Sequence, residues 1–398
     1  MFGLKYSGRG KEKPAVAVVS SLSELNPLGA NAHTESLVRI LRPSVDRVYI
    51  LAATFPAFDE GNILKVKVRR YGDKQHDFIL LKFLRYLLTD FKLSLKLVSI
   101  SKHVDIVMYG SRSYFLAALT SKLLGKKCIV FAFNSLARVA KELVDSRSMI
   151  SMIKDGIFPP VLMGLLDTAV LTLADRVWIE SNSVIDFAGL HKYKRKIFVC
   201  GAIYIDTEHL KVRRKPDERE NIIGYIGRLG ETKRVLNIVK AIPMVVGRYS
   251  NAKFFFGGGG PLMDELENEI KSNELEKVVE VAGWVSRSEL PYQLNRIKLF
   301  VLPSATEGLP RALREAMACG AVVLATPVGG VPDLIKDGET GFILEDGSPE
   351  CIARTIVKAL EYPRLGDIAQ NAETLIRQEY SYSAMATRCR LGLSDLMV

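Results

Sequence analysis

The sequence of 398 residues contains few cysteines and no long uncharged hydrophobic segment. Its five cysteines show no paired spacing, which argues against a disulfide framework and a zinc site, and we expect them to be buried thiols. Because no apolar run reaches about 18 uncharged residues, a membrane-spanning helix is not predicted. Residues 1–13 are basic and lack the apolar core of a signal peptide, so we expect a disordered tail and a cytoplasmic protein.

The composition is that of a folded protein, with 48% hydrophobic and 25% charged residues. The length suits two α/β domains better than one core. Residues 1–200 hold 30 Lys and Arg against 17 Asp and Glu, whereas the remainder holds 25 against 27. The basic half therefore predicts an anionic partner, such as membrane lipid, lipid phosphate or nucleic acid. A basic surface that meets only solvent is the alternative.

Residues 299–320 contain the most informative pattern in the chain. An apolar run at 299–302 predicts a strand, and apolar residues at helical spacing between 312 and 317 predict a helix after a loop. Pro310 suits the first turn of this helix, and Gly320 suits the position just past its last turn. The segment is predicted to run from strand through loop to helix.

Two glutamates flank the start of this helix. Glu307 falls in the loop and Glu315 falls inside the helix, so both can reach a ligand at the helix N-terminus. Free N–H groups and the positive end of the helix dipole favour an anion there, such as a diphosphate. In the simpler alternative, Glu315 pairs with Arg311 one turn back on a surface helix, a contact of about 0.3 to 0.5 kcal/mol.

Other motifs near this segment favour the ligand-binding interpretation. Together with residues 326–332 and 337–341, the motifs Pro303-Ser304, Glu307-Gly308, 315–318 and Gly320 resemble the donor-binding signature of glycosyltransferase family 4. The resemblance implies a retaining nucleotide-sugar transferase of the GT-B type, with two Rossmann-like α/β domains facing across a cleft. It also implies that Glu307 lies by the donor sugar, that Glu315 bonds the ribose hydroxyls, and that the backbone of Gly308, Leu309 and Pro310 supports the diphosphate.

A second cluster follows the predicted strand at 222–226. The loop 227–233 contains Arg228, whose forked guanidinium suits phosphate oxygens, and Lys233, a compact charge at the start of the next helix. In the family these two residues bind the donor diphosphate without a metal, and we expect no metal or other cofactor here. Trp284 and Val285 lie where family members hold the nucleobase largely by backbone contacts, and Trp284 is either a stacking residue or part of the core.

The N-terminal half is predicted to hold buried strands at 15–20, 105–109 and 127–132. The loop after the first strand contains Gly29, which by resemblance contacts the donor phosphate or the acceptor. The family often places a histidine at the ends of the other two strands, and this chain has none there. Tyr109 and Asn134 at these strand ends remain candidates for polar contacts with the sugar or acceptor.

A basic and apolar helix is predicted at 78–102. At 100° per residue its basic side chains fall within about 80° of one another, and most of the remaining surface is apolar. The predicted membrane-facing residues are Lys82, Arg85, Lys92 and Lys96. The wide apolar face would lie either against another helix or in the headgroup region of an anionic bilayer.

These features predict an acceptor domain at 14–205, a linker at 206–221, a donor domain at 222–375, and a C-terminal helix at 376–398 that returns to the first domain. The expected activity is transfer of a sugar from a UDP- or GDP-sugar to a hydroxyl acceptor, a lipid-linked glycan or other glycoconjugate at the inner face of the cell membrane. Nucleic acid is not an expected partner, and the oligomeric state is left open.

Two other functions are considered. A nucleotide-sugar epimerase of the same fold would need acid and base groups by the sugar, and the scarcity of histidine at the strand ends disfavours it. A non-catalytic module that binds membrane or nucleic acid would explain the basic half but would leave Glu307, Glu315, Arg228 and Lys233 without a role.

Overall fold

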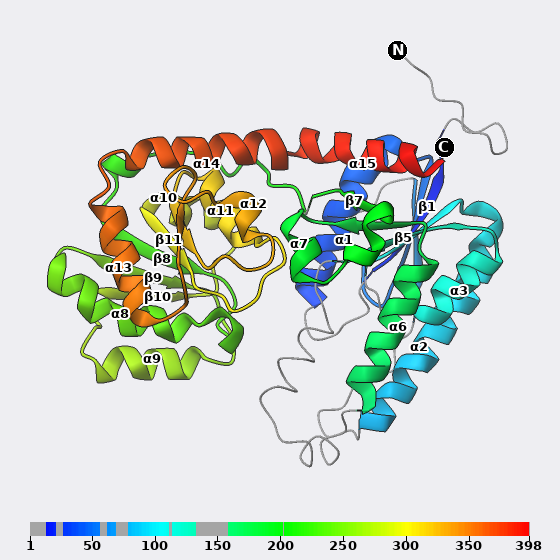
Figure 1. The fold of residues 1–398 in the computed structure, drawn as a ribbon, viewed down its shortest axis with the longest axis horizontal. Helices are drawn as coiled ribbons and strands as arrows, with labels where there is room; N and C mark the ends of the chain where they lie inside the picture. Colours follow the sequence, from blue (N-terminus) through cyan, green and yellow to red (C-terminus); the bar gives the residue numbers. More distant parts are fainter. Residues whose placement is uncertain are drawn as a thin grey trace. The chain divides into compact units, whose positions relative to one another are not determined.

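The computed structural model describes residues 13–20, 27–55, 62–68, 79–110, 114–132, 158–201 and 203–397, without the side chains of 27–33, 79–83 and 158–163. It divides into two compact units. Unit 1 comprises the chain to Glu180, Val184–Ile203 and the chain from Met385, and unit 2 comprises Ser181–Ser183 and Tyr204–Ala384. Each unit is a parallel sheet with helices on its faces (Figure 1).

Within the described residues, unit 1 has a seven-stranded parallel sheet in the order β3-β2-β1-β4-β5-β6-β7. The central β1 pairs with β2 on one side and β4 on the other, and Val16 lies between Val48 and Ile106. Both faces of the central strands are buried, which is why their sequences are almost continuously apolar. The strands are β1 (Ala15–Val19), β2 (Arg47–Ala52), β3 (Ile63–Lys67), β4 (Ile106–Tyr109), β5 (Lys127–Phe131), β6 (Arg176–Ile179) and β7 (Ile197–Val199).

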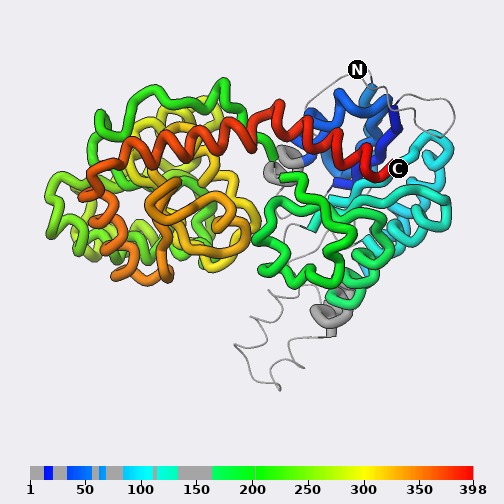
Figure 2. Tube along the Cα trace, turned by 45° about the horizontal axis from the view of Figure 1, so that its top comes forward, coloured from blue at the N-terminus to red at the C-terminus, as the bar shows by residue number. Residues whose placement is uncertain are grey.

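The helices α2, α3 and α6 of unit 1 lie side by side in both views (Figure 1 and Figure 2). Asp90 of α2 joins two of them, because its carboxylate accepts hydrogen bonds from the backbone N–H groups of Leu116 and Ala117 in the first turn of α3. Burial raises the pKa of Asp90 to about 6. The helices are α1 (Pro27–Leu41), α2 (Ile79–Ile100), α3 (Phe115–Leu123), α6 (Phe158–Leu173), α7 (Ser183–Phe187) and α15 (Tyr382–Met397), with 3-10 turns at Arg42–Ser44, Ser101–His103 and His191–Lys196. The first residue of α7 and the first three residues of α15 are assigned to unit 2.

Unit 2 has a six-stranded parallel sheet among its described residues, in the order β10-β9-β8-β11-β12-β13. The chain builds β8, β9 and β10 outward in one direction, then returns to place β11 beside β8. The strand order therefore reverses between β8 and β11, the position at which open parallel sheets bind ligands. The strands are β8 (Ile222–Ile226), β9 (Lys253–Gly257), β10 (Val279–Gly283), β11 (Leu299–Leu302), β12 (Val322–Ala325) and β13 (Phe342–Ile343).

The helices of unit 2 cover its sheet, and α13 packs against α8 (Figure 1). They are α8 (Val235–Arg248), α9 (Met263–Ser272), α10 (Leu290–Arg296), α11 (Arg311–Ala318), α12 (Val331–Leu334), α13 (Pro349–Leu360) and α14 (Leu365–Tyr380), with 3-10 turns at Pro216–Glu218 and Glu231–Lys233. No helix in the described part of the chain has the length and apolarity that crossing a bilayer requires.

The polar run at 206–221 is packed against unit 2 and does not behave as a free linker. The buried guanidinium of Arg219 donates to the carbonyl oxygens of Leu294, Ile297 and Cys319, at 3.2, 2.6 and 2.6 Å. Sequence reasoning separated these residues from the donor domain because their composition is polar. The structure assigns them to unit 2, since buried Arg219 satisfies carbonyl groups at the C-terminal ends of α10 and α11.

The C-terminal helices are divided between the two units. Helix α14 belongs to unit 2, whereas the chain from Met385 onward packs with unit 1. There Gly392 lies close against Trp178 and Phe198, and Arg176 donates to Asp395 at 2.7 Å.

Candidate functional site

The reversal point of the unit 2 sheet brings Glu307 and Lys233 together. Nζ of Lys233, from the loop after β8, lies 2.6 Å from Oε1 of Glu307, from the loop after β11. The buried hydroxyl of Ser304 donates to the same oxygen at 2.6 Å. Oε2 of Glu307 has no hydrogen-bond partner among the described residues, so one oxygen of this nearly buried carboxylate is fixed and the other can accept from a ligand.

The loops after β8 and β9 touch through their backbones. The N–H of Leu229 donates to the carbonyl of Gly259 at 3.0 Å, and the N–H of Gly227 donates to Gly257 at 2.9 Å. A Cβ atom added at Gly258 would lie 1.9 Å from the carbonyl oxygen of Gly227. A Cβ atom at Gly260 would likewise lie 2.2 Å from the carbonyl oxygen of Leu229. Gly258 and Gly260 therefore permit a close backbone approach, which positions the loop that carries Arg228 and Lys233.

Arg228 is exposed at the carboxyl end of β8, and its guanidinium has no hydrogen-bond or ion-pair partner within the described residues. Its backbone is held instead, because the hydroxyl of Tyr225 donates to the Arg228 carbonyl at 2.7 Å. Burial, and next the charge of Glu307, raises the pKa of Tyr225 above its usual value, so this hydroxyl stays protonated as a donor. The guanidinium remains available for an anion.

The predicted diphosphate loop ends at the N-terminus of α11. Helix α11 begins at Arg311, and Pro310 is its N-cap residue in an extended conformation, one position before the predicted place. The Gly308 carbonyl accepts a hydrogen bond from the N–H of Gly330 at 2.6 Å, which fixes the loop before α11 to the loop after β12. Gly320 follows the helix with φ +75°, as the prediction of a terminating glycine requires.

Glu315 accepts hydrogen bonds from two arginines. Its Oε1 accepts Nε of Arg311 at 2.7 Å and Nη1 of Arg287 at 2.9 Å, while Oε2 has no hydrogen-bond partner in the described chain. The simple pair of Glu315 with Arg311 is thus present, but it is joined by an arginine from the loop after β10. Like Glu307, Glu315 is nearly buried and keeps one oxygen for a ligand.

The loop after β10 presents Trp284 to solvent. Its side chain is 75% exposed, so the structure excludes the interpretation of Trp284 as core. Val285 turns inward, and its Cγ2 would lie 2.7 Å from a Cβ atom at Gly257. Both residues lie at the carboxyl edge of the sheet, the edge that also carries Glu307.

The remaining predicted residues belong to unit 1. Tyr109 is fully buried, with its hydroxyl bonded to the Ala117 carbonyl and the Ser121 hydroxyl at 2.8 and 2.7 Å. This corrects the prediction that Tyr109 contacts the sugar or acceptor, because the hydroxyl serves the packing of α3 on the sheet. Gly29 lies in the first turn of α1, and Asn134 lies outside the described residues.

Sequence reasoning did not assign roles to Ser304 and Arg287. Ser304 stands three residues before Glu307 at the end of an apolar strand, and this spacing could have indicated a hydroxyl that orients the carboxylate. Arg287 gave no comparable signal, because its contact joins residues that are 28 positions apart.

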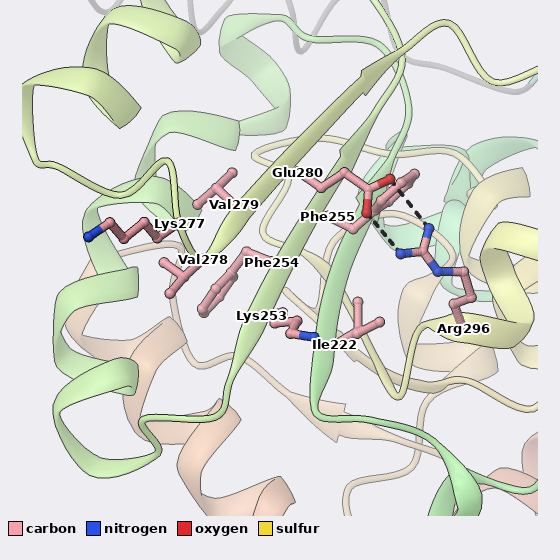
Figure 3. A pocket seen from close by; sticks show the side chains of 9 residues that line it. All are labelled: Ile222, Lys253, Phe254, Phe255, Lys277, Val278, Val279, Glu280 and Arg296. Atoms are coloured by element: carbon pink, nitrogen blue, oxygen red, sulfur yellow. Dashed lines mark hydrogen bonds and ion pairs between the residues drawn. The ribbon is translucent and has the colours of Figure 1, made fainter.

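A pocket at the opposite, amino edge of the same sheet has a different character (Figure 3). There Arg296 pairs with Glu280 at 2.8 Å and lies over the ring of Phe255, so its charge is already matched. The starts of β8, β9 and β10 form this pocket, away from the loops that carry Glu307 and Glu315. We therefore assign the candidate site to the carboxyl edge.

Comparisons with known proteins bear on this site. Residues 206–375 match the family model described as Glycosyl transferases group 1. The chain is 32% identical over 184 residues to the alpha-D-kanosaminyltransferase of Streptomyces kanamyceticus, covering 45% of this chain and 47% of that protein. It is 30% identical over 166 residues to the N-acetyl-alpha-D-glucosaminyl L-malate synthase of Bacillus anthracis, covering 41% of this chain and 43% of that protein.

The solved structure of HepE from Anabaena in complex with UDP covers 96% of this chain and all of that chain, with TM-score 0.70 and 16% identity. The chain has a GT-B fold. Together with the family model and the relatives, this supports its place in the GT-B glycosyltransferase superfamily. The match spans less than half the length of these two curated relatives.

Proposed function

We propose that the chain is a retaining glycosyltransferase of family 4 that moves a sugar from a UDP- or GDP-sugar to a hydroxyl acceptor. The contact between Lys233 and Glu307 at the reversal point of the unit 2 sheet carries this proposal. It sets a cation and a carboxylate side by side where a charged leaving group and a sugar must both bind. The matching family model describes glycosyl transferases and one relative is named a kanosaminyltransferase, in agreement with this chemistry.

In the proposed mechanism the protein acts through positioned charge. Arg228, Lys233 and the N–H groups at the start of α11 bind the diphosphate and stabilise the negative charge that grows on it as the sugar leaves. Glu307 orients the sugar through its unpaired oxygen, and Glu315 holds the ribose in the same way. The cationic side chains supply the charge that the diphosphate needs, so the proposal invokes no metal.

Retention of configuration follows in this proposal from attack on the face that the diphosphate leaves. Oε1 of Glu307 is already bound by Lys233 and Ser304, an arrangement that suits accepting a sugar hydroxyl better than attacking the anomeric carbon. The acceptor hydroxyl forms the new bond to that carbon while the bond to the phosphate oxygen breaks. Its proton passes to the departing phosphate.

The first test is thermal stabilisation by a panel of nucleotide-sugars and nucleoside diphosphates. A ligand at about 100 times its Kd should stabilise the folded protein by roughly 2.7 kcal/mol, and Glu315→Ala should lose most of this shift. Glu280→Ala is the matched control, because Glu280 also pairs with an arginine but at the amino edge. Stabilisation by none of the nucleotides, or equal stabilisation of wild type and Glu315→Ala, would contradict the donor site.

We further propose that the acceptor is lipid-linked and that unit 1 meets the inner face of the cell membrane through α2. Five apolar side chains of α2 are 47–54% exposed and repeat every three or four residues; this α2 stripe consists of Leu84, Leu88, Phe91, Leu95 and Val98. Lys92 and Lys96 lie beside it and, with Lys67 and Ser99, line a groove. Apolar side chains next to lysines fit an anionic bilayer surface.

Charge reversal tests the membrane proposal. We expect the protein to sediment with vesicles that contain anionic lipid and the double variant Lys92→Glu/Lys96→Glu to remain largely in the supernatant, since each lost cation costs about 1 kcal/mol of attraction and each new anion repels. Lys194→Glu/Arg195→Glu changes the net charge equally on another exposed segment of unit 1 and is the control. Equal sedimentation of both double variants would count against α2 as the contact.

The proposal also includes Lys82 and Arg85, which the sequence predicts to face the membrane. Arg85 is half-buried on α2, whereas the side chain of Lys82 lies outside the described ones.

A further inference from the structure

Arg314 lies inside unit 2, on the helix that follows the loop 308–310. The side chain is only 1% exposed, and it is among the largest fully buried side chains of the described chain. Burying a guanidinium is costly, because its charge and its hydrogen-bond donors leave water. An apolar side chain of similar volume could fill the same space on α11 without that cost. The contacts of the guanidinium therefore have to explain why an arginine stands here.

The guanidinium binds the loop before α11. Its Nη2 donates to the carbonyl oxygen of Leu309 at 3.4 Å. The carbonyl before it, that of Gly308, accepts the N–H of Gly330 at 2.6 Å. The carbonyl after it, that of Pro310, accepts the backbone N–H of Arg314 at 3.3 Å. All three carbonyl groups of the loop thus have donors within unit 2, and a substitution of Arg314 would remove the side-chain donor to Leu309.

This arrangement suits a loop that binds an anion through N–H groups. The first N–H groups of a helix have no partner within the helix, and they attract negative charge. A carbonyl oxygen turned toward the same anion would repel it, because it is the negative end of the peptide dipole. By binding the Leu309 carbonyl on the buried side, Arg314 keeps that oxygen away from a bound phosphate.

Tyr380 fixes the guanidinium in this place. It is the last residue of α14, which packs against α11 (Figure 1). The guanidinium carbon of Arg314 lies 5.3 Å from the centroid of the Tyr380 ring, which is itself buried. A cation over an aromatic face is stabilised electrostatically, so the ring offsets part of the cost of burying the charge.

We propose that Arg314 is a positioning residue for the donor diphosphate. It orients the loop 308–310 so that N–H groups, and not the Leu309 carbonyl, face the phosphates. This inference rests on the proposed function, in which the start of α11 binds the diphosphate. Arg314 should therefore affect binding of the phosphates and leave binding of the nucleoside unchanged.

The experiment is calorimetric titration of wild type and variants with UDP and GDP, with uridine and guanosine measured by competition. The wild type should bind at least one diphosphate more tightly than its nucleoside. Arg314→Met keeps the buried volume without charge or donor. It should weaken that diphosphate by about tenfold or more, the typical effect of a hydrogen bond to a charged group, and leave the nucleoside within a few-fold. Arg314→Lys keeps a charged donor and should retain most of the preference for the diphosphate.

Arg219→Met is the matched control. Arg219 is also a buried arginine of unit 2, but it donates to the Cys319 carbonyl at the other end of α11. This variant should be less stable to heat and keep the wild-type ratio of diphosphate to nucleoside affinity. An unchanged ratio in Arg314→Met, or an equal loss of the ratio in both methionine variants, would overturn the positioning role.

Two further results keep the test decisive. If Arg314→Met does not fold, Tyr380→Leu replaces it, because it removes the ring and leaves the sequence of α11 intact. Tyr380→Leu should lower the preference for the diphosphate, and an unchanged preference would contradict the proposal. Failure of the wild type to bind either diphosphate would overturn the donor site itself and, with it, this inference.

Discussion

Replacing Lys233 with alanine should lower kcat/KM for sugar transfer by about a hundredfold to a thousandfold, the loss typical of one preorganised group that stabilises transition-state charge. Lys233 has two tasks in the proposed mechanism, since it faces the diphosphate and holds Oε1 of Glu307 at 2.6 Å. Steady-state kinetics of transfer to acceptor measure the effect. Lys240→Ala, which removes an exposed lysine farther along α8, should leave kcat/KM unchanged.

The same substitution leaves a nearly buried carboxylate without its cation, so a fall in activity has to be separated from a fall in stability. Comparison of Lys233→Ala with Lys233→Ala/Glu307→Gln separates them, because the glutamine removes the unpaired charge. The double variant should regain thermal stability and remain inactive. Wild-type turnover in Lys233→Ala would refute the proposed mechanism at its central contact.

Much of unit 2 could be predicted from the sequence. The strands at 222–226 and 299–302 were predicted at their observed bounds, because a buried parallel strand needs an uninterrupted apolar run. Glu307 and Lys233 are 74 positions apart, and only the resemblance to a family placed them in one site. Periodicity alone could not do so, since the pairing of β8 with β11 depends on the order of the whole sheet.

The failures have local causes. Tyr109 was predicted as a possible contact because it ends a strand, but strand-end position does not reveal which face a side chain takes. Asp90 interrupts the apolar surface of α2. The structure explains this residue, because its carboxylate accepts hydrogen bonds from two backbone N–H groups in the first turn of α3. The sequence could not show whether the wide apolar face of α2 packs against another helix or contacts lipid, because both environments favour the same apolar residues.

The substitution Gly258→Ala, which adds a single methyl group, should strongly destabilise unit 2. We expect it to lower the free energy of unfolding of unit 2 by about 3 kcal/mol or more, since backbone strain and overpacking each cost roughly 1 to 3 kcal/mol. The residue has φ +125°, a conformation that side-chain-bearing residues rarely adopt, and the new Cβ would lie 1.9 Å from the carbonyl oxygen of Gly227. The obstructing atom is backbone, so no rotamer change can relieve the contact. Urea unfolding monitored by circular dichroism measures the change.

The neighbouring glycine supplies the control for this prediction. A Cβ at Gly259 would meet no atom within 4 Å among the described residues, and its φ is not in the positive region, so Gly259→Ala should change stability by less than about 1 kcal/mol. If Gly258→Ala folds, the loop after β8 must shift to admit the methyl group and would carry Arg228 and Lys233 with it. Activity should then fall further than the remaining folded fraction explains. Equal stability of the two variants would mean that the loops after β8 and β9 do not approach as closely as the structure has them, and that Gly258 does not help to position the cations of the site.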